Sequence, residues 1–230
     1  MEIASGKIRD ITPDKLIIEV PYTNIERACL RKYSEVLIGL PDNRKISPEQ
    51  RRKAYALIEE ISIWSGYEPI EVTKETTKMQ FLLQKDCIKF EMFSLSNCSI
   101  TTAREYITFL IDFIIKNNIP TKRPLLPLCE DINKYVYACL MNKVCAVCGK
   151  PAQLHHVERI GMGRNRNTIN HLNMLVLPLC GIHHIECHGM PQYEFNEKHH
   201  LVPIKLTAEI GKKYNLSNKN LEVKIWNDLN

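Results

Sequence analysis

Short runs of apolar residues near the start of the chain predict strands. In the segments KLIIEV (15–20) and EVLIGL (35–40), apolar residues alternate or group in a way that is typical of a strand. The polar run PDNRK (41–45) follows the second segment and predicts a turn. A further strand is expected at 88–95. The first part of the chain is therefore predicted to be mixed α/β.

The first long helix has a well-marked start. Ser47 is placed to cap the helix, Pro48 suits its first position, and Gln50 completes a capping box in which side chains bond free amide groups. Apolar residues then recur at helical spacing as far as Trp64. Gly66 follows and favours the end of a helix. The sequence therefore predicts a helix that begins at Pro48 and ends before Gly66.

Helical periodicity continues further along the chain. Helices are expected at 72–83 and 101–117, and the second has an apolar stripe suited to a core or to a dimer contact. The prolines of TKRPLLP (121–127) predict a linker, and another helix is expected at 130–142. We therefore divide the chain into an N-terminal domain at 1–120, a linker with a helix at 121–142, a cysteine- and histidine-rich module at 143–200, and a polar C-terminal tail with one short helix at 201–230.

Composition narrows the class of protein. The chain has 230 residues, 44% of them apolar, which is enough for a packed core. No apolar run approaches the roughly 20 residues that span a bilayer, and the opening MEIASGKIRD lacks the apolar core of a signal peptide. We therefore expect a cytoplasmic protein with no membrane partner. The net charge of +5 permits a nucleic-acid partner but does not require one.

Cysteine and histidine are more informative than charge. Nine cysteines in a chain expected to be cytoplasmic indicate reduced thiols and metal ligands more than disulfides. All eight histidines lie between residues 155 and 200, and the first 154 residues contain none. The last two, His199 and His200, fall outside any motif and are expected on the surface. A requirement for imidazole is therefore confined to one stretch of the chain.

Four residues in this stretch have the spacing of a zinc site. Cys145 and Cys148 form a C-x2-C pair, and Cys180 and His183 form a C-x2-H pair downstream. Zinc prefers four such donors in a tetrahedron, and two local pairs supply them with little loss of chain entropy. Cys187 is an alternative to His183 as the fourth ligand.

Four further histidines suit a second metal site. His184 and His188 are four residues apart, so on a helix they point from one face and can bind one ion. His155 and His156 are adjacent, so on a strand they point to opposite sides. One of them can therefore bind the ion while the other faces substrate. The unligated ring, with an unperturbed pKa near 6.5, is suited to taking a proton from water.

The motifs CAVCGKPAQLHH, NHLNMLVLPLC and GIHHIECH follow one another between residues 145 and 188. Their order resembles an HNH endonuclease of the zinc-stabilised kind. The resemblance implies a ββα-metal core, in which two strands and a helix surround one catalytic ion. It also implies the hydrolysis of a phosphodiester bond.

The resemblance assigns roles to particular residues. His156 matches the general base, and His155 matches the metal ligand that precedes it. His184 and His188 resemble the helix pair that completes the three-histidine metal site of colicin-type nucleases.

A further residue of the motif, placed before the second strand, holds the base in orientation. Asn173 is the literal match to this residue. His171 lies two positions earlier and can serve the same role, so both are candidates.

The segments DNRKISPEQRRKAYALIEEIS and FSLSNCSITTAREYITFLIDFIIKNNI resemble the lambda Orf (NinB-type) family of phage recombination proteins. The similarity covers about residues 30–120. It implies a homodimer that binds single-stranded DNA and the single-strand-binding protein, and that assists the loading of a recombinase.

Two groups of basic residues are candidates for DNA contacts. On charge pattern alone, a solvated helix face is the default explanation for the basic residues near the first long helix. For the two arginines of the later loop, a plain flexible loop is an equally good explanation. The Orf resemblance favours DNA contacts for the group at the start of the first long helix, and the glycines of GMGRNRN (161–167) permit close approach of a phosphate. The expected DNA-binding residues are Arg44, Lys45, Arg51, Arg52, Lys53, Arg164 and Arg166.

Together these patterns predict an α+β protein in which an N-terminal mixed α/β, Orf-like domain precedes a zinc-stabilised ββα-metal (HNH) module. The expected cofactors are a structural Zn²⁺ and one catalytic divalent ion, which is Mg²⁺, Zn²⁺ or Ni²⁺. The leading hypothesis is a phage DNA-recombination protein that binds single-stranded or branched DNA and cleaves a phosphodiester. The alternative is a non-enzymatic recombination mediator with a purely structural zinc module. A third hypothesis, an RNA-binding zinc protein, is weaker, because the sequence lacks the aromatic stacking patches that are typical of proteins that bind single-stranded RNA.

Overall fold

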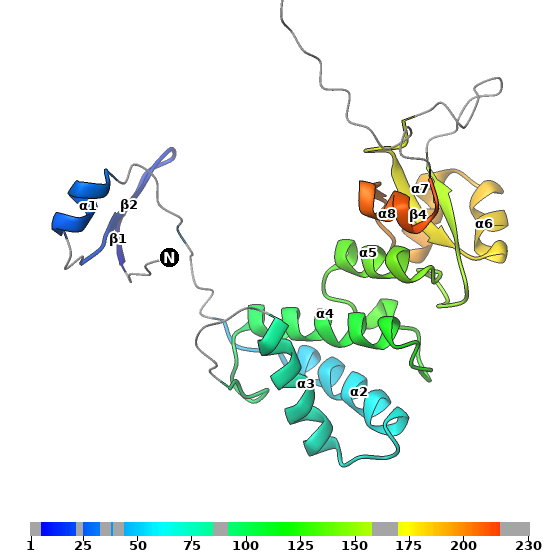
Figure 1. The fold of residues 1–230 in the computed structure, drawn as a ribbon, viewed down its shortest axis with the longest axis horizontal. Helices are drawn as coiled ribbons and strands as arrows, with labels where there is room; N and C mark the ends of the chain where they lie inside the picture. The colour runs from blue at the N-terminus through cyan, green and yellow to red at the C-terminus, as the bar shows by residue number, and fades with distance from the viewer. Residues whose placement is uncertain are drawn as a thin grey trace, which may run out of the picture. The chain divides into compact units, whose positions relative to one another are not determined.

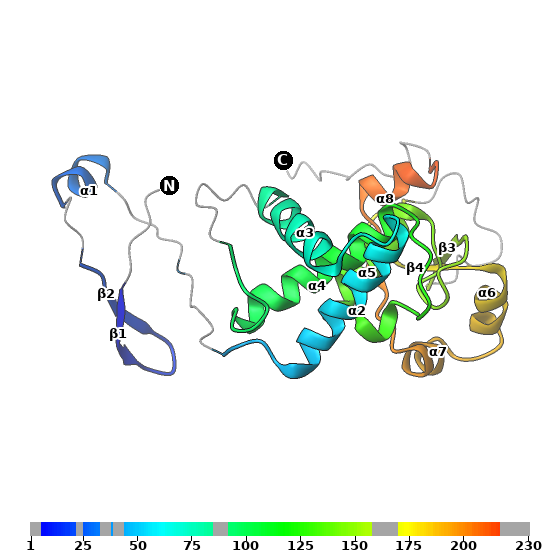
Figure 2. The ribbon, with the colours of Figure 1, turned by 90° about the horizontal axis from the view of Figure 1, so that it is seen from below.

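The computed structural model describes residues 6–21, 25–32, 38, 44–84, 92–157 and 170–216 (Figure 1, Figure 2). The chain divides into two compact units, residues 1–41 and 42–230.

The first unit contains a β-hairpin and a short helix. Strand β1 (Lys7–Ile11) pairs antiparallel with β2 (Leu16–Glu19), and α1 (Ile25–Arg31) follows. Strand β2 confirms the strand predicted at 15–20, whereas β1 and α1 have no counterpart in the sequence prediction. The strand predicted at 35–40 falls outside the described residues except for Ile38.

The second unit opens with three helices, α2 (Pro48–Trp64), α3 (Ile70–Gln84) and α4 (Ile100–Lys116), and all three confirm predicted helices. At the start of α2, the Gln50 N–H donates to Ser47 Oγ (3.0 Å) and the Ser47 N–H donates to Gln50 Oε1 (3.2 Å). The capping box is therefore confirmed. Gly66, just beyond the end of α2, has a φ of +96°, which glycine adopts without strain.

The strand predicted at 88–95 is absent from its described part. Residues 92–94 are not in a strand, and a turn begins at Leu95. The guanidinium of Arg51 donates to the carbonyl oxygens of Leu95 (2.9 Å) and Ser96 (2.6 Å). The Arg51 side chain therefore takes the hydrogen bonds of carbonyl groups that would otherwise bond a neighbouring strand. The alternation of apolar and polar residues in the sequence does not reveal this side-chain contact. Residues 85–91 lie outside the described part of the chain.

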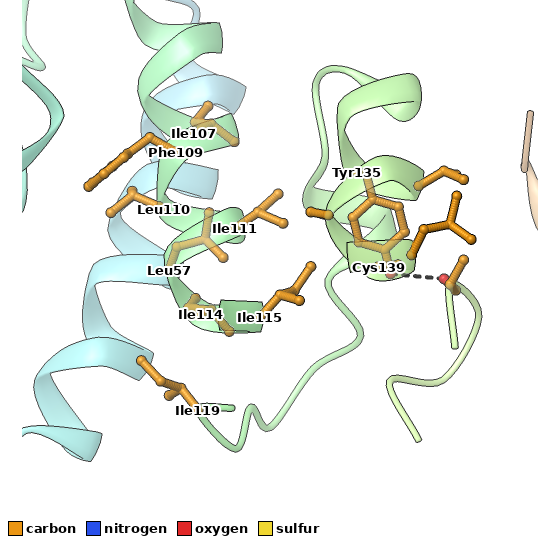
Figure 3. Close-up of a cluster of buried hydrophobic side chains, with 14 of the residues drawn as sticks. Leu57, Ile107, Phe109, Leu110, Ile111, Ile114, Ile115, Ile119, Tyr135 and Cys139 are labelled. Carbon is orange, nitrogen blue, oxygen red and sulfur yellow. Dashed lines mark hydrogen bonds between the residues drawn. The ribbon is translucent and has the colours of Figure 1, made fainter. Parts of the chain in front are cut away.

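The apolar stripe of α4 lies at the centre of the core. Figure 3 shows Ile111 and Ile115 pointing from α4 toward α5 (Ile132–Asn142), while Leu57 approaches from α2. Leu110 and Leu57 are completely buried, and a side chain of this size contributes about 1.5–3 kcal/mol when buried. The stripe is therefore a core contact within the chain.

Among the described residues, no helix combines the length and apolarity needed to cross a membrane.

A three-stranded antiparallel sheet in the order β3 (Gln153–His156), β4 (Leu175–Leu179), β5 (Ile204–Lys205) forms the second part of this unit. Strand β3 confirms the extended segment expected around His155 and His156, and α6 (Gly181–His188) confirms the helix expected to carry His184 and His188. The elements after α4 are η1 (Leu126–Leu128), α5 (Ile132–Asn142), β3 (Gln153–His156), β4 (Leu175–Leu179), α6 (Gly181–His188), α7 (Gln192–His199), β5 (Ile204–Lys205) and α8 (Ala208–Lys213).

Residues 201–216 belong to the sheet and its core, which corrects the prediction of a polar tail after residue 200. In the register of β4 and β5, Val176 lies opposite Ile204. Leu201, Leu206 and Ile210 are buried among the apolar residues of the module. Lys205, Thr207 and Glu209 interrupt the apolar residues, and the following stretch 211–230 is rich in lysine and asparagine, so the composition of the tail as a whole concealed its buried face.

The predicted boundary near residue 120 also differs from the structure. The boundary between the two compact units lies between residues 41 and 42 of the sequence. Helices α4 and α5, on either side of the proline-rich linker, pack against each other. The proline-containing segment lies between α4 and α5, as expected, but it does not separate two units.

Replacing Ile210 by alanine tests whether the C-terminal segment belongs to the core. Ile210 lies on α8 and is completely buried, so Ile210→Ala is expected to lower the free energy of unfolding by about 2–5 kcal/mol. Val202→Ala is the control, because Val202 lies in the same segment but is 47% exposed; its effect is expected to stay within about 0.5–1 kcal/mol. Denaturant unfolding of the purified protein measures both. Equally small effects of the two substitutions would contradict the packing of α8.

Candidate functional site

The four residues of the predicted zinc site lie together. Sγ of Cys148 is 3.7 Å from Sγ of Cys180, and Nδ1 of His183 is 3.4 Å from Sγ of Cys145 and 3.2 Å from Sγ of Cys180. One donor atom from each residue lies within 4.8 Å of the other three. The structure therefore brings the C-x2-C and C-x2-H pairs into one cluster, here called the thiol cluster.

Backbone hydrogen bonds shape the turn that carries the first two cysteines. The Cys145 N–H donates to the carbonyl of Lys150 (2.7 Å), and the Gly149 N–H donates to the carbonyl of Cys145 (2.8 Å). Gly149 has a φ of +70°, a conformation that is unfavourable for residues other than glycine. The Tyr135 hydroxyl, on α5 (Figure 3), donates to the carbonyl of Ala146 (2.8 Å). The turn is thus attached to α5 as well as to the sheet.

The donor distances and the thiol chemistry fit zinc. A tetrahedron with zinc–sulfur distances of about 2.3 Å has sulfur–sulfur edges of about 3.8 Å, close to the spacing of Cys148 and Cys180. Burial raises the pKa of the Cys148 thiol to about 11. Burial also acts to raise the pKa of Cys180, but hydrogen bonds from His183, Cys148 and Cys145 outweigh it and lower this pKa to about 6. The cluster therefore stabilises a thiolate, the form of cysteine that binds zinc.

The structure separates the two candidates for the fourth position. His183 contacts two of the three sulfur atoms, whereas Sγ of Cys187 lies 3.4 Å from Nε2 of His155. His183 and Cys187 are four residues apart on α6, but only His183 contributes a donor atom to the thiol cluster. The geometry thus favours His183.

Three histidines form a second cluster, here called the histidine cluster. His155 comes from β3, and His184 and His188 come from α6. The ring centroid of His155 is 4.9 Å from that of His184 and 5.2 Å from that of His188, and the two α6 rings are 4.8 Å apart. One nitrogen from each ring lies within 4.8 Å of the other two. The predicted ligands therefore converge.

Two rings of the histidine cluster, those of His155 and His184, favour the neutral form, which is the form of imidazole that binds a metal. Burial lowers the pKa of His155, and the neighbouring rings of His184 and His188 lower it further. Burial, followed by the charge of His188, lowers the pKa of His184. A neutral imidazole keeps a lone pair on one nitrogen, so these residues fit one divalent ion.

His156, which follows His155 on β3, forms a separate pair of imidazoles with His171. Nε2 of His156 is 3.1 Å from Nδ1 of His171, and His171 is buried. Asn173 is exposed in a turn with a φ of +67°, and its N–H donates to the carbonyl of Leu206 (3.0 Å). Of the two candidates for orienting His156, the structure therefore places His171 in contact with it.

Two of the basic residues at the start of α2 contact other groups within the chain. Arg51 donates to backbone carbonyls, and Nζ of Lys53 lies 2.7 Å from Glu130 and 3.0 Å from Glu49. These two side chains therefore have structural partners. The side chains of Arg44, Lys45 and Arg52 are exposed, whereas Arg164 and Arg166 lie outside the described residues.

Sequence reasoning missed residues that support the two clusters. Oε1 of Gln192 is 3.1 Å from Nε2 of His155. His199, expected on the surface, is only partly exposed, and its ring lies 4.6 Å from the ring of Phe195 and 5.5 Å from that of His183. His200 is exposed, as expected. Gln192 carried no signal in the sequence, because it belongs to no motif and contacts His155 only in the folded chain.

Zinc content tests the choice of the fourth ligand. His183→Ala is expected to remove one equivalent of tightly bound zinc, since only three donors remain in the thiol cluster, whereas Cys187→Ala is expected to retain it. Elemental analysis of the purified variants measures both. Structural zinc stabilises the fold, so His183→Cys serves as a folded control that keeps four donors and one zinc. Loss of this zinc in Cys187→Ala, but not in His183→Ala, would contradict the assignment.

The chain matches the family described as "Putative HNHc nuclease" over residues 18–217, which is most of its length. No curated protein and no solved structure matches the chain. The matched residues include the three helices α2, α3 and α4 as well as both metal-ligand clusters. The chain therefore belongs to this family of HNH nucleases.

Proposed function

We propose that the protein is a metal-dependent endonuclease that hydrolyses a phosphodiester bond of DNA. The observation that carries this proposal is the convergence of His155, His184 and His188, with His156 next to His155 on the same strand. Because neighbouring residues of a strand point to opposite sides, one imidazole binds the ion and the next stays available for proton transfer.

The histidine cluster is proposed to bind the catalytic ion. When bound there, a divalent ion would polarise the phosphodiester and offset negative charge on the leaving oxygen. Three nitrogen donors suit Zn²⁺ or Ni²⁺ better than Mg²⁺, which prefers oxygen ligands. We therefore place Zn²⁺ and Ni²⁺ ahead of Mg²⁺ among the expected ions.

His156 is proposed to be the general base. It takes a proton from a water molecule, the water oxygen forms a bond to phosphorus, and the bond from phosphorus to the leaving sugar oxygen breaks. His171 is proposed to hold the His156 ring in position through the 3.1 Å contact between their nitrogens. The same contact stabilises the protonated His156 ring that forms during the reaction.

The thiol cluster is proposed to bind a structural Zn²⁺. Its ligands come from the turn before β3 and from the start of α6, so a bound ion joins these elements. Four protein donors complete the coordination of zinc and leave no position for substrate, which is typical of a structural site.

We further propose that the protein acts in phage DNA recombination, on single-stranded or branched DNA. The support is the resemblance of residues 30–120 to Orf-type proteins, together with the exposed side chains of Arg44, Lys45 and Arg52 near the start of α2. The same resemblance supports a homodimer and a contact with the single-strand-binding protein.

The first test of the proposed chemistry is the substitution His156→Ala. It is expected to lower the rate of metal-dependent cleavage by about 100- to 10,000-fold, because the proton acceptor is removed. DNA affinity and zinc content are expected to stay close to those of the wild type. Cleavage of forked, single-stranded and duplex DNA with Zn²⁺, Ni²⁺ or Mg²⁺ measures the rate. If the wild type cuts none of these substrates, the protein is instead a recombination mediator with a structural zinc module.

Two substitutions distinguish the residues that could orient His156. His171→Leu is expected to lower kcat, with a smaller loss than His156→Ala, because the base remains but loses its contact. Asn173→Gly keeps the positive φ while removing the side chain, and is expected to retain wild-type kcat. A large loss in Asn173→Gly with little loss in His171→Leu would reverse the assignment.

Charge substitutions test the proposed binding of single-stranded DNA. Replacing Arg44, Lys45 and Arg52 together by glutamine is expected to weaken binding. If all three contact phosphates, the slope of log affinity against log salt should decrease in magnitude by about 2. Titration of a labelled single strand at several salt concentrations measures this slope. A control variant loses the same charge elsewhere, by replacing the exposed lysines Lys116, Lys122 and Lys134 by glutamine. Equal slopes for the two variants would contradict a DNA surface at the start of α2.

A further inference from the structure

The hydrogen bonds around His155 assign a role to Gln192, the first residue of α7. Resting on the function proposed above, we propose that Gln192 is a positioning residue that fixes the tautomer of His155. In this tautomer Nε2 carries the hydrogen and Nδ1 presents its lone pair to the ion. Gln192 thus acts on the ion through His155 and does not contact it.

The contact between the two side chains determines where the hydrogen lies. Oε1 of Gln192 is 3.1 Å from Nε2 of His155. An amide oxygen only accepts hydrogen bonds, so Nε2 must be the donor. A neutral imidazole carries one hydrogen, and its other nitrogen, Nδ1, therefore has the free lone pair.

A second hydrogen bond orients the amide of Gln192. Its Nε2 donates to Oδ1 of Asn196 (2.9 Å), one turn further along α7. Rotating the amide by half a turn would direct its NH₂ group toward His155 and its oxygen toward Oδ1 of Asn196, which is itself an acceptor. The bond from Gln192 to Asn196 therefore directs Oε1 of Gln192 toward His155.

The position of Cys187 supports the same orientation of the His155 ring. The Cys187 thiol donates to Oε1 of Gln192 (3.3 Å), and its sulfur is 3.4 Å from Nε2 of His155. Cys187 is nevertheless outside the group of donors formed by His155, His184 and His188. We infer that Nε2 faces Cys187 and Gln192, and that the opposite nitrogen faces the other two histidines.

This arrangement has a general physical consequence. A metal-binding histidine that donates its other N–H to a carbonyl oxygen has a fixed ring and a more basic ligand nitrogen. Loss of such a partner typically weakens metal binding by about 10- to 100-fold. Gln192→Leu removes the acceptor while approximately keeping the volume, and Gln192→Glu keeps an acceptor oxygen.

Metal titration tests this inference without measuring activity. Protein loaded with one equivalent of Zn²⁺ in the thiol cluster is titrated with further Zn²⁺ against a chelator. Gln192→Leu is expected to bind the second equivalent about 10- to 100-fold more weakly than the wild type, and Gln192→Glu is expected to restore most of this affinity. The control is Gln153→Leu, the same change at an exposed position on β3, which is expected to leave both equivalents unchanged.

A spectroscopic measurement separates a positioning role from a merely structural one. Nitrogen-15 NMR of the His155 ring is expected to show hydrogen on Nε2 in the wild type and a mixture of tautomers in Gln192→Leu. Hydrogen on Nδ1 in the wild type, or unchanged second-ion affinity in Gln192→Leu, would overturn the inference while leaving the proposed nuclease intact. A wild type that binds no second ion would overturn the proposed catalytic site, and this inference with it.

Discussion

Both metal-ligand clusters depend on the position of one short helix, α6. His183 and His184 are consecutive residues, so their side chains leave the helix about 100° apart and reach different clusters. His183 joins the three cysteines, whereas His184 and His188 face His155. Zinc in the thiol cluster would hold the start of α6 against the turn before β3. The spacing of the catalytic ligands is therefore proposed to depend on an ion that takes no part in the reaction.

The local patterns of the sequence identified candidate ligands that the structure brings together, because each pair is close in the chain. Cys145 and Cys148 share a turn, Cys180 and His183 share the first turn of α6, and the spacing of His184 and His188 required only a helix. The resemblance to HNH endonucleases then placed His155 with this helix. The family match supports the nuclease assignment, and the structure shows that the predicted donors converge.

Features that depend on contacts between distant segments could not be predicted in the same way. Gln192 contacts His155 only because α7 packs against α6 in the folded chain, and no motif marks it. The choice between His171 and Asn173 also required a folded turn, since both precede β4. Arg51 resembled a DNA contact, but its guanidinium bonds two carbonyl oxygens far along the chain. Residues 201–230 were predicted to form a polar tail, although Leu201, Leu206 and Ile210 are buried in the core.

The attachment of the zinc-binding turn to α5 limits how the nuclease part can be separated from the rest of the chain. Tyr135 bonds the carbonyl of Ala146 in that turn, and α5 packs in turn on the apolar stripe of α4. A fragment cut at the proline-rich linker would expose Ile111 and Ile115 on one side and the facing surface of α5 on the other. This HNH module therefore cannot be transferred to another protein by itself. A chimera of two family members that exchanges the module must exchange a compatible α4 as well.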